Sequence, residues 1–508
     1  MTREETVGAL SRTRFDLLVV GGGIIGAAVA AHAARQGLAV ALVERSDFGG
    51  ATSSASSKLI HGGLRYLRLG DVRLVREAHH ERRTLATVVA PHLVRRIPFL
   101  LPLYRGGPYR PAVVQSAILF YSALARSRLN WLVKPERARG LVPPLREDGL
   151  RACALYADAW TNDARLCLAN VRAAADAGAC VLNGAEVVAL RRSGGRVSGA
   201  EVAVDGDTTG VDARVVVNAA GPWIDEVRRL EDPNAGTSVV LAKGVHALVP
   251  ADREWAAALT IPQDRLRVTF ALPFYGMLLL GTTDEPLDRG PEDVAVGPGD
   301  VEQVVAEAAV AVDPAIASLD RVRAAYAGTR VLPVAEGESV SLRRETVISH
   351  GSCSMLSVAG GKLTTYRRIA VDVLERLRAD LELHRVDPRP WPLPGAGDLG
   401  SVRFPAELDP SIRTHLLHLY GTLAAEVIAS AAAEPELLEP LHEQGPDIAA
   451  QVRYAATHEW ARSADDVIRR RTTLFYRGLA DDAAAVRRIA AELERARGLE
   501  ASDKLLLG

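Results

Sequence analysis

Residues 15–44 read FDLLVVGGGIIGAAVAAHAARQGLAVALVE, and this stretch decides the fold of the chain. The apolar run 15–20 predicts a buried strand, and the alanine-rich run 27–36 predicts a helix that Gly37 ends. A second apolar run, 38–44, predicts another strand. Strand, helix and strand together form a βαβ unit, whose crossover we expect to be right-handed.

Three glycines and one acid within this unit predict a dinucleotide site. Gly21 permits the tight turn after the first strand, Gly23 lets the backbone approach a pyrophosphate, and Gly26 lets helix and strand pack closely. The helix N-terminus then offers N–H groups and partial positive charge to phosphates. Glu44 ends the second strand and can accept both ribose hydroxyls, whereas it would repel the 2′-phosphate of NADP.

Two observations favour FAD over NAD as the dinucleotide. The βαβ unit opens the sequence and no second predicted βαβ unit with a GxGxxG turn follows it, since the later GAGDLG at 395–400 comes after a proline-rich run. A separate nicotinamide site is therefore not expected, and the substrate itself becomes the electron donor. Residues 216–221, VVNAAG, also predict a strand that returns glycine-rich chain toward a cofactor. Neither observation decides the question by itself.

Composition sets the scale of the molecule. The chain has 508 residues, 48% hydrophobic and 24% charged, which at about 100–200 residues per domain corresponds to roughly two to four domains. A net charge of −1 gives no reason to expect nucleic acid. Residues 17–34 carry no charged side chain apart from His32 and are long enough for a membrane span. The glycines interrupt them, however, so we interpret them as strand, turn and helix.

Charge is unevenly distributed along the chain. Residues 65–139 hold 15 Lys or Arg against 4 Asp or Glu. Such a stretch is either a solvated face or a surface that meets anionic lipid or an anionic substrate. The apolar residues 99–104 and the amphipathic run 112–129 within it suit peripheral attachment to an anionic bilayer, and packing of that helix on the core is an equal alternative.

The remaining sequence predicts further strands and helices. Helices are expected over 77–94, 112–129, 299–312 and from 363 onward. Strands are expected over 179–204 (a hairpin with its turn at 193–195), 214–221, 241–249, 266–283 and 356–361, with 266–283 interrupted by Pro273 and Gly276. The proline-rich run 388–394 marks a linker, and residues 412–507 are rich in Ala, Leu, Glu and Arg.

Four motifs resemble those of one family. Residues 51–66 read ATSSASSKLIHGGLRY, and they are followed by NAAGPW at 218–223, GTTD at 281–284 and GGKLTTYR at 360–367. Together they resemble the FAD-dependent glycerol-3-phosphate dehydrogenases of the aerobic, quinone-linked type. The likeness runs over about 15–368 in family order and includes the tail through 454–471.

The resemblance implies an architecture. It comprises an α/β FAD-binding domain of Rossmann type, like that of glutathione reductase, an α+β substrate-binding domain and an all-helical C-terminal domain. We expect the FAD-dependent oxidoreductase region over 1–395 and the helical domain over 396–508. FAD-binding segments are expected at about 15–105, 150–235 and 325–385, interleaved with substrate-binding segments at about 106–149 and 236–324.

The resemblance also implies the reaction. sn-Glycerol 3-phosphate is oxidised to dihydroxyacetone phosphate, with a hydride passing from C2 to flavin N5. Such a substrate needs cationic donors for its phosphate and a group that takes the hydroxyl proton. By position in the motifs, the substrate-binding residues are Arg65, Tyr66, Arg330, Arg344 and Lys362, with Arg343 as the alternative to Arg344.

The catalytic candidates are His61, Arg330 and Lys362. His61 is favoured as the proton acceptor, because an imidazole titrates near neutral pH. Two alternatives stay open: His61 only hydrogen-bonds the flavin edge, or Lys362 is the base. The FAD contacts carried over from the motifs are Gly21, Gly23, Ile24, Gly26, Glu44, Thr52, Ser53, Ser57, Lys58, Leu59, His61, Val187, Gly221, Trp223, Gly361, Leu363, Thr364 and Thr365. No metal ligands are predicted.

Other features leave the partners open. The four cysteines show no metal-like or disulfide-like spacing, and the first 16 residues lack the apolar core of a secretory signal. We therefore expect a cytoplasmic protein, with peripheral attachment to the cytoplasmic face of the inner membrane as an option and a homodimer as another. A quinone is the expected electron acceptor, with oxygen as the alternative.

Rival functions also stay open. The chain departs from the usual family pattern at Ile25, at residues 243–246 (Lys-Gly-Val-His) and at 337–343. A related flavoenzyme acting on a hydroxy acid or an amino acid is therefore one alternative, and a flavin-binding protein without turnover is another.

Overall fold

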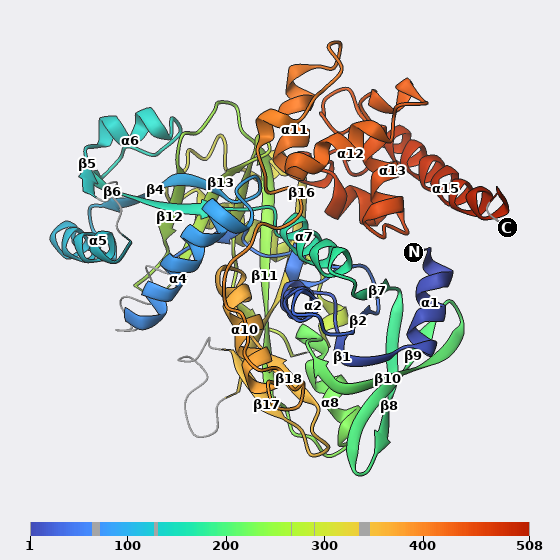
Figure 1. Cartoon of the computed structure of the whole chain (residues 1–508). Helices are drawn as coiled ribbons and strands as arrows, with labels where there is room; N and C mark the ends of the chain where they lie inside the picture. The colour runs from blue at the N-terminus through green and yellow to red at the C-terminus, as the bar shows by residue number, and fades with distance from the viewer. Residues whose placement is uncertain are drawn as a thin grey trace.

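Two β-sheets and a group of C-terminal helices make up the protein (Figure 1). The computed structural model describes residues 2–62, 72–125, 131–265, 267–288, 290–334 and 346–506. Within these residues, the first sheet carries the βαβ unit and the second lies beside it. Both sheets contribute to the cavity described below.

The first sheet has a parallel centre, in the order β17-β18-β10-β1-β2-β7. Strands β18, β10, β1, β2 and β7 pair in parallel, while β17 is antiparallel to β18 and the β8–β9 hairpin adds to β10. The hairpin turns between 193 and 196, as the sequence predicts. The strands are β1 (Arg14–Val20), β2 (Val40–Glu44), β7 (Cys180–Asn183), β8 (Ala185–Ser193), β9 (Arg196–Val204), β10 (Asp207–Asn218), β17 (Val347–His350) and β18 (Leu356–Ala359).

Helix α2 (Ile24–Arg35) lies at the centre of the molecule. Every residue from 24 to 34 is buried except Ile25, which is half-buried. Helices α7 (Asp163–Asp176) and α10 (Tyr366–Arg376) pack against it. The apolar character of 17–34 thus comes from a buried strand and a central helix. Among the described helices, none combines the length and apolar composition needed to cross a bilayer.

The second sheet is mostly antiparallel, in the order β15-β11-β14-β13-β12-β4-β6-β3. Strand β16 pairs with β11 over its whole length, β5 pairs with β6, and only β4 and β12 pair in parallel. The strands are β3 (Leu59–Ile60), β4 (Arg95–Tyr104), β5 (Trp131–Val133), β6 (Leu150–Trp160), β11 (Val239–Pro250), β12 (Ala258–Pro262), β13 (Val268–Phe274), β14 (Met277–Gly281), β15 (Glu285–Pro286) and β16 (Ala324–Pro333).

This sheet draws strands from segments that the sequence assigned to FAD binding. Strands β4, β6 and β16 lie within those segments, yet they pair with one another or with β11 and β12. A strand pattern indicates a strand but not its partner, and these partners are far apart in the sequence. The expectation that residues 99–104 contribute to membrane attachment is wrong. They belong to β4, where Phe99 and Leu100 are fully buried, so they do not form a membrane-facing surface.

Among the other helices before the C-terminal region, three differ from prediction mainly at their ends: α4 (Val72–Thr84), α5 (Pro111–Ala125) and α9 (Pro298–Ala308). Three more were not predicted: α1 (Arg3–Arg12), α6 (Pro135–Leu141) and α8 (Ile224–Glu231). The helix predicted over 77–94 stops earlier, because α4 passes into a π-helical turn at Leu85–Val89 and Ala90 is no longer helical. Pro91 disfavours helical geometry in the residue before it.

The strand region 266–283 is a hairpin rather than an interrupted strand. Pro273 stays within β13, and the chain reverses at Tyr275 and Gly276, which have φ values of 53° and 81°. Two consecutive residues at positive φ match the twist of the flanking strands.

The C-terminal region is helical, as predicted. It contains α11 (Pro410–Tyr420), α12 (Ala424–Ala429), α13 (Ala449–His458), α14 (Ala464–Asp466) and α15 (Ala483–Leu506), with a π-helical turn at Val467–Arg471. Between 396 and 506, β-pairing is limited to one isolated bridge between Pro440 and Ile448. These helices share an apolar core with the second sheet, where the ring of Tyr476 meets that of Phe274 at 5.2 Å.

Candidate functional site

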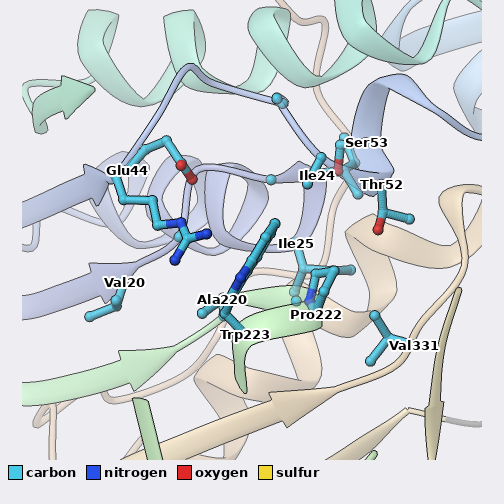
Figure 2. A pocket seen from close by; sticks show the side chains of 18 of the residues that line it. Val20, Ile24, Ile25, Glu44, Thr52, Ser53, Ala220, Pro222, Trp223 and Val331 are labelled. Carbon is cyan, nitrogen blue, oxygen red and sulfur yellow. Dashed lines mark hydrogen bonds between the residues drawn. The ribbon is translucent and has the colours of Figure 1, made fainter. Parts of the chain in front are cut away.

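A cavity of about 630 Å³ lies where β1, β2 and β10 end. Ligands of open α/β sheets bind at this edge, beyond the carboxyl ends of the strands. Figure 2 shows Glu44 toward one end of the cavity and Thr52 and Val331 toward the other, with the Trp223 ring between them. The wall is formed by residues from 20–25, 43–53, 185–188, 219–230, 330–332 and 360–363, together with Ser56 and Asp163.

The glycine turn has the tight geometry that its sequence predicts. Gly21 has a φ of +107°, and a Cβ there would lie 2.5 Å from the Ala219 carbonyl oxygen. A Cβ on Gly26 would lie 1.9 Å from the Gly21 carbonyl oxygen. Helix α2 starts at Ile24, directly after Gly23, so its positive end faces the cavity that both residues line. Gly26 does not line the cavity; its role is close packing.

Glu44 anchors the loop beyond β2. One carboxylate oxygen accepts the Gly22 N–H at 2.8 Å, and the other accepts the Ser46 N–H at 2.8 Å and its hydroxyl at 3.0 Å. The carboxylate therefore joins the glycine turn to the next segment of the wall.

This loop contributes the cation of an aromatic and cationic pair. The Arg45 guanidinium is 4.1 Å from the centre of the Trp223 ring, within the range of a cation–π contact. Trp223 is a predicted FAD contact, whereas Arg45 was missed. Its one signal in the sequence is its position directly after Glu44.

Arg330 is fixed on the wall by the GTTD motif. Its guanidinium donates to the Thr282 hydroxyl at 3.2 Å and the Thr283 carbonyl at 3.0 Å, and it pairs with Asp284 at 2.5 Å. Strand β16 carries Arg330, and its register against β11 brings the arginine beside this motif. Lys362 also lines the cavity and is half-buried. Two predicted catalytic residues thus share one cavity.

The 3-10 turn Thr52–Ser54 connects the two halves of the wall. The Ser53 hydroxyl accepts the Ile24 N–H at 2.9 Å, and the Thr52 hydroxyl donates to the Thr329 carbonyl at 2.7 Å. One short turn therefore contacts both the start of α2 and the strand that carries Arg330.

Most predicted FAD contacts lie on the cavity wall, and the others are not part of its lining. On the wall are Gly21, Gly23, Ile24, Glu44, Thr52, Ser53, Val187, Gly221, Trp223, Gly361 and Leu363. Those off the wall, besides Gly26, are Ser57, Lys58, Leu59, His61, Thr364 and Thr365.

His61 keeps a link to the GGKLTTYR motif. Its N–H donates to the Thr364 hydroxyl at 3.2 Å, which places β3 beside that motif. The choice between His61 and Lys362 as the base stays a prediction. Arg65, Tyr66, Arg343 and Arg344 lie outside the described residues.

The Lys58 side chain does not reach the cavity. Its ammonium is fully buried and donates to Asp163 at 2.6 Å, to the Ser54 carbonyl at 2.5 Å and to the Tyr476 hydroxyl at 3.0 Å. Burial alone would lower the pKa of this ammonium, but Asp163 and the Tyr476 hydroxyl keep it above its ordinary value. A buried ammonium needs a carboxylate partner, so the side chain turns toward Asp163.

Several residues of the wall were not predicted. Asp163 joins the wall from the start of α7 and accepts the Ser56 N–H at 3.0 Å and its hydroxyl at 2.6 Å. No local pattern distinguishes this aspartate. Others adjoin predicted motifs and could have been found by extending them, among them Ile25, Ser46, Gly49, Gly50, Ala51, Glu186, Ala220, Pro222 and Gly360.

A buried histidine stands behind the Ser57 hydroxyl. His246 Nε2 lies 3.0 Å from Ser57 Oγ, and the imidazole stacks on Tyr326 at 4.9 Å. Burial, followed by the charges of Lys58 and Arg330, lowers the pKa of His246 well below its ordinary value. The imidazole is therefore neutral.

The donor set fits FAD. The glycine turn and helix N-terminus suit a pyrophosphate, Glu44 suits ribose hydroxyls, and apolar and aromatic surfaces continue the wall toward Arg330. Gly21 and Gly26 leave no space for a Cβ, which is expected where backbone must approach a ligand or another strand closely.

Comparison with known proteins gives the same result over most of the chain. The family described as FAD dependent oxidoreductase matches residues 16–367, and the C-terminal domain of alpha-glycerophosphate oxidase matches residues 359–504. Glycerol-3-phosphate dehydrogenase of Mycobacterium leprae is 36% identical over 474 residues, covering 90% of this chain and 80% of the relative. That of Pseudomonas aeruginosa is 34% identical over 497 residues, covering 93% and 94%.

A solved structure is similar in fold along nearly the whole chain. It is the glycerol-3-phosphate dehydrogenase of Bacillus halodurans complexed with FAD, with a TM-score of 0.77 and 27% identity. The match covers 97% of this chain and 93% of that one.

Proposed function

We propose a function on the premise that this chain belongs to the FAD dependent oxidoreductases and, within them, to the FAD-dependent glycerol-3-phosphate dehydrogenases. It oxidises sn-glycerol 3-phosphate to dihydroxyacetone phosphate and passes the electrons to a membrane quinone. FAD is the cofactor, and when bound it supplies the acceptor for the C2 hydride at flavin N5. The protein residues bind both molecules, orient the substrate and take the hydroxyl proton.

The observation that carries the proposal is the anchoring of Arg330. Contacts to Thr282, Thr283 and Asp284 hold its guanidinium on the wall of the FAD cavity. A guanidinium held in a fixed orientation is suited to a phosphate, because it stays positively charged and carries five N–H donors in one plane.

The other substrate groups are assigned by their motif positions. Arg65, Tyr66 and Arg344 complete the proposed phosphate and hydroxyl contacts. Lys362, on the same wall as Arg330, is proposed to contact the substrate beside the flavin. His61 is proposed as the base for the C2 hydroxyl, with Lys362 as its rival.

Anaerobic flavin bleaching tests this function. Glycerol 3-phosphate is expected to bleach the bound flavin fully, whereas lactate, 2-hydroxyglutarate and sarcosine leave it yellow. Faster bleaching by one of those three would assign another substrate class. Flavin that no substrate bleaches would indicate a flavin-binding protein without turnover.

An apolar patch on α5 supports the quinone and membrane part of the proposal. Val113, Leu119 and Phe120 are 66%, 56% and 49% exposed, whereas Val114 and Ile118 pack inward. The exposed Arg105 and Arg110 stand before the helix. Apolar side chains beside cations suit the surface of an anionic bilayer, where a quinone is available.

Vesicle binding tests the membrane part. We expect salt-sensitive binding to phosphatidylglycerol vesicles and little binding to phosphatidylcholine vesicles. A Leu119→Ser/Phe120→Ser variant should bind about tenfold or more weakly, since each buried apolar side chain contributes about 1.5–3 kcal/mol. Val310→Ser, at a 43% exposed position elsewhere, is the control. If the wild-type protein does not bind phosphatidylglycerol vesicles, this part of the proposal is wrong.

Oxygen is the second candidate acceptor, because the C-terminal match is to a domain named for an oxidase. Reoxidation of the reduced flavin by a soluble quinone analogue and by oxygen, measured by stopped flow, separates the two. The quinone proposal expects the faster rate with the analogue.

A further inference from the structure

One loop of the FAD cavity is held from behind by the C-terminal helices. This 45–51 loop, residues 45 to 51, joins β2 to the 3-10 turn at 52, and five of its seven residues line the cavity. The other two, Asp47 and Phe48, are buried at 5% and 0% exposure. The Phe48 ring meets the Trp460 ring at 5.5 Å, edge to face, and Trp460 belongs to the C-terminal region.

Asp47 is held by two arginines of the C-terminal π-helical turn. Arg471 donates through both terminal nitrogens, one of them at 2.8 Å, and Arg470 donates through Nε. Asn183 of β7 adds a contact at 3.3 Å. Burial alone would raise the pKa of the Asp47 carboxyl, but Arg471 and Arg470 hold it below its ordinary value.

Arg471 has no exposed surface and also donates to the Glu459 carbonyl at 2.5 Å. The C-terminal region therefore places buried cationic charge directly behind the cavity wall.

A second contact holds the segment that follows the 45–51 loop, residues 52–58. The Tyr476 hydroxyl donates to the Ser54 carbonyl at 3.3 Å and lies 3.0 Å from the Lys58 ammonium. Lys58 pairs with Asp163, which itself lines the cavity. The 45–51 loop and residues 52–58 are thus both held by side chains more than 400 positions away in the sequence.

We propose that the C-terminal helical region is part of the FAD site. Arg470 and Arg471 are positioning residues that act through Asp47 on the 45–51 loop. Tyr476 is a positioning residue that acts through Ser54 and Lys58 on residues 52–58. The region is then a fixed back wall for the cofactor rather than a separate binding module. Its removal or loosening lowers FAD affinity before it affects any substrate step.

Arg471→Met tests the proposal against a matched change at Arg453. Arg453 is also buried and ion-paired, but its partners Glu434 and Glu492 both lie within the C-terminal region. FAD is titrated into deflavinated full-length protein and followed by flavin fluorescence, with the melting temperature of the apoprotein measured in parallel. We expect Arg471→Met to weaken FAD binding about tenfold or more, because a charge-assisted contact to the loop is lost.

The control separates positioning from general stability. Arg453→Met is expected to lower the melting temperature of the apoprotein while changing FAD affinity by less than about twofold. Equal FAD affinity in Arg471→Met and wild type overturns the proposal. Equal weakening by both variants overturns it too, because the effect would then follow domain stability alone.

Tyr476→Phe provides a test that removes no charged side chain. It keeps the ring against Phe274 and removes only the hydroxyl near Ser54 and Lys58. A severalfold loss of FAD affinity with a changed flavin circular dichroism spectrum supports the proposal. An unchanged affinity and spectrum count against it, including in the case where Arg471→Met yields no folded protein.

Discussion

The two ends of the cavity are built in different ways. At the Glu44 end, the glycine turn, the helix start and the acid come from 30 consecutive residues, 15–44. At the Arg330 end, β16 and the GTTD motif meet because β11 pairs with both β14 and β16, and residues 360–363 join them from the end of β18 in the first sheet. The Glu44 end is therefore specified by local backbone geometry, whereas the Arg330 end depends on the register of strands that are distant in the sequence. Changes at the two ends should therefore affect different quantities.

Closing the glycine turn should have the largest effect. In Gly26→Ala, the new Cβ would meet the Gly21 carbonyl oxygen at 1.9 Å, and neither backbone can move without opening the turn. We expect the purified protein to carry less than about a tenth of the wild-type flavin, because overpacking against backbone costs on the order of 1–3 kcal/mol or more in addition to the lost cofactor contacts. Flavin absorbance relative to protein absorbance measures this.

Gly140→Ala in α6 is the matched control, since nothing lies within 4 Å of a Cβ there. It should purify fully yellow. A Gly26→Ala protein that is equally yellow would contradict the local description of this end.

Removing Arg330 should affect turnover and leave the cofactor in place. Arg330→Ala is expected to lower kcat/KM for glycerol 3-phosphate by about 10–100-fold, because hydrogen bonds to charged groups contribute about 1.5–3 kcal/mol each. Flavin content should stay near that of wild type, and Arg330→Lys should recover part of the loss. Steady-state kinetics at saturating acceptor is the measurement.

Arg323→Ala, at an exposed position just before β16, controls for the loss of a positive charge. If Arg330→Ala kept full kcat/KM but lost its flavin, the division between the two ends would be wrong.

Glu44→Gln should weaken FAD binding by about tenfold, a smaller effect than that of Gly26→Ala. The two carboxylate oxygens of Glu44 accept the N–H groups of Gly22 and Ser46. In Gln, one of these oxygens becomes an NH2 group, which is a donor and cannot accept the backbone N–H that it faces. Glu186→Gln changes a carboxylate of the same wall that is weakly paired with Arg45 at 4.0 Å, and it should cost less than about threefold. Equal effects of the two variants would mean that charge alone is important.

The smallest effect concerns the scaffold behind the Glu44 end. Burial, followed by the charges of Arg367 and Arg35, lowers the pKa of His32 on α2 to about 3. The unfolded chain therefore binds this proton more readily, and the stability of the folded state falls as pH drops below about 6.5. From pH 7 to pH 5, His32 should account for about 2 kcal/mol of lost unfolding free energy.

His32→Phe keeps a ring against Trp391 and should remove that share of the pH dependence in urea unfolding at pH 7 and pH 5. His80→Gln, at an exposed position, is the control. An unchanged pH dependence in His32→Phe would rule out this account of the central helix.

The same contrast explains what the sequence could predict. The turn at 21–26 and Glu44 follow from short-range periodicity, and their geometry agrees with expectation. Arg330 was found through its motif, but its partners Thr282 and Asp284 became apparent only through strand pairing. The pairing partners of β4, β6 and β16 could not be predicted either, because pairing across long distances leaves no local pattern.

Buried charges were the hardest feature to predict. The motif placed Lys58 at FAD, yet its ammonium pairs with Asp163, which no pattern distinguished. Arg470 and Arg471 resemble ordinary surface arginines in an arginine-rich tail until the structure brings them to Asp47. The energetic cost of an unpaired buried charge explains such pairs once the fold is known, but it does not identify the partner beforehand.

The pairing of Asp47 with Arg471 also determines when during synthesis the cavity wall becomes complete. The two residues are 424 positions apart. At about 5–20 residues per second, a ribosome needs roughly 20–90 s to make the intervening chain. Throughout that time the nascent protein already has its glycine turn and Glu44, while Asp47 has no arginine partner from the C-terminal region. If FAD binding requires the 45–51 loop to be held as proposed, cofactor capture waits until Arg471 has been made, and a chain terminated before Arg471 would carry the fingerprint of the site without the wall that closes it.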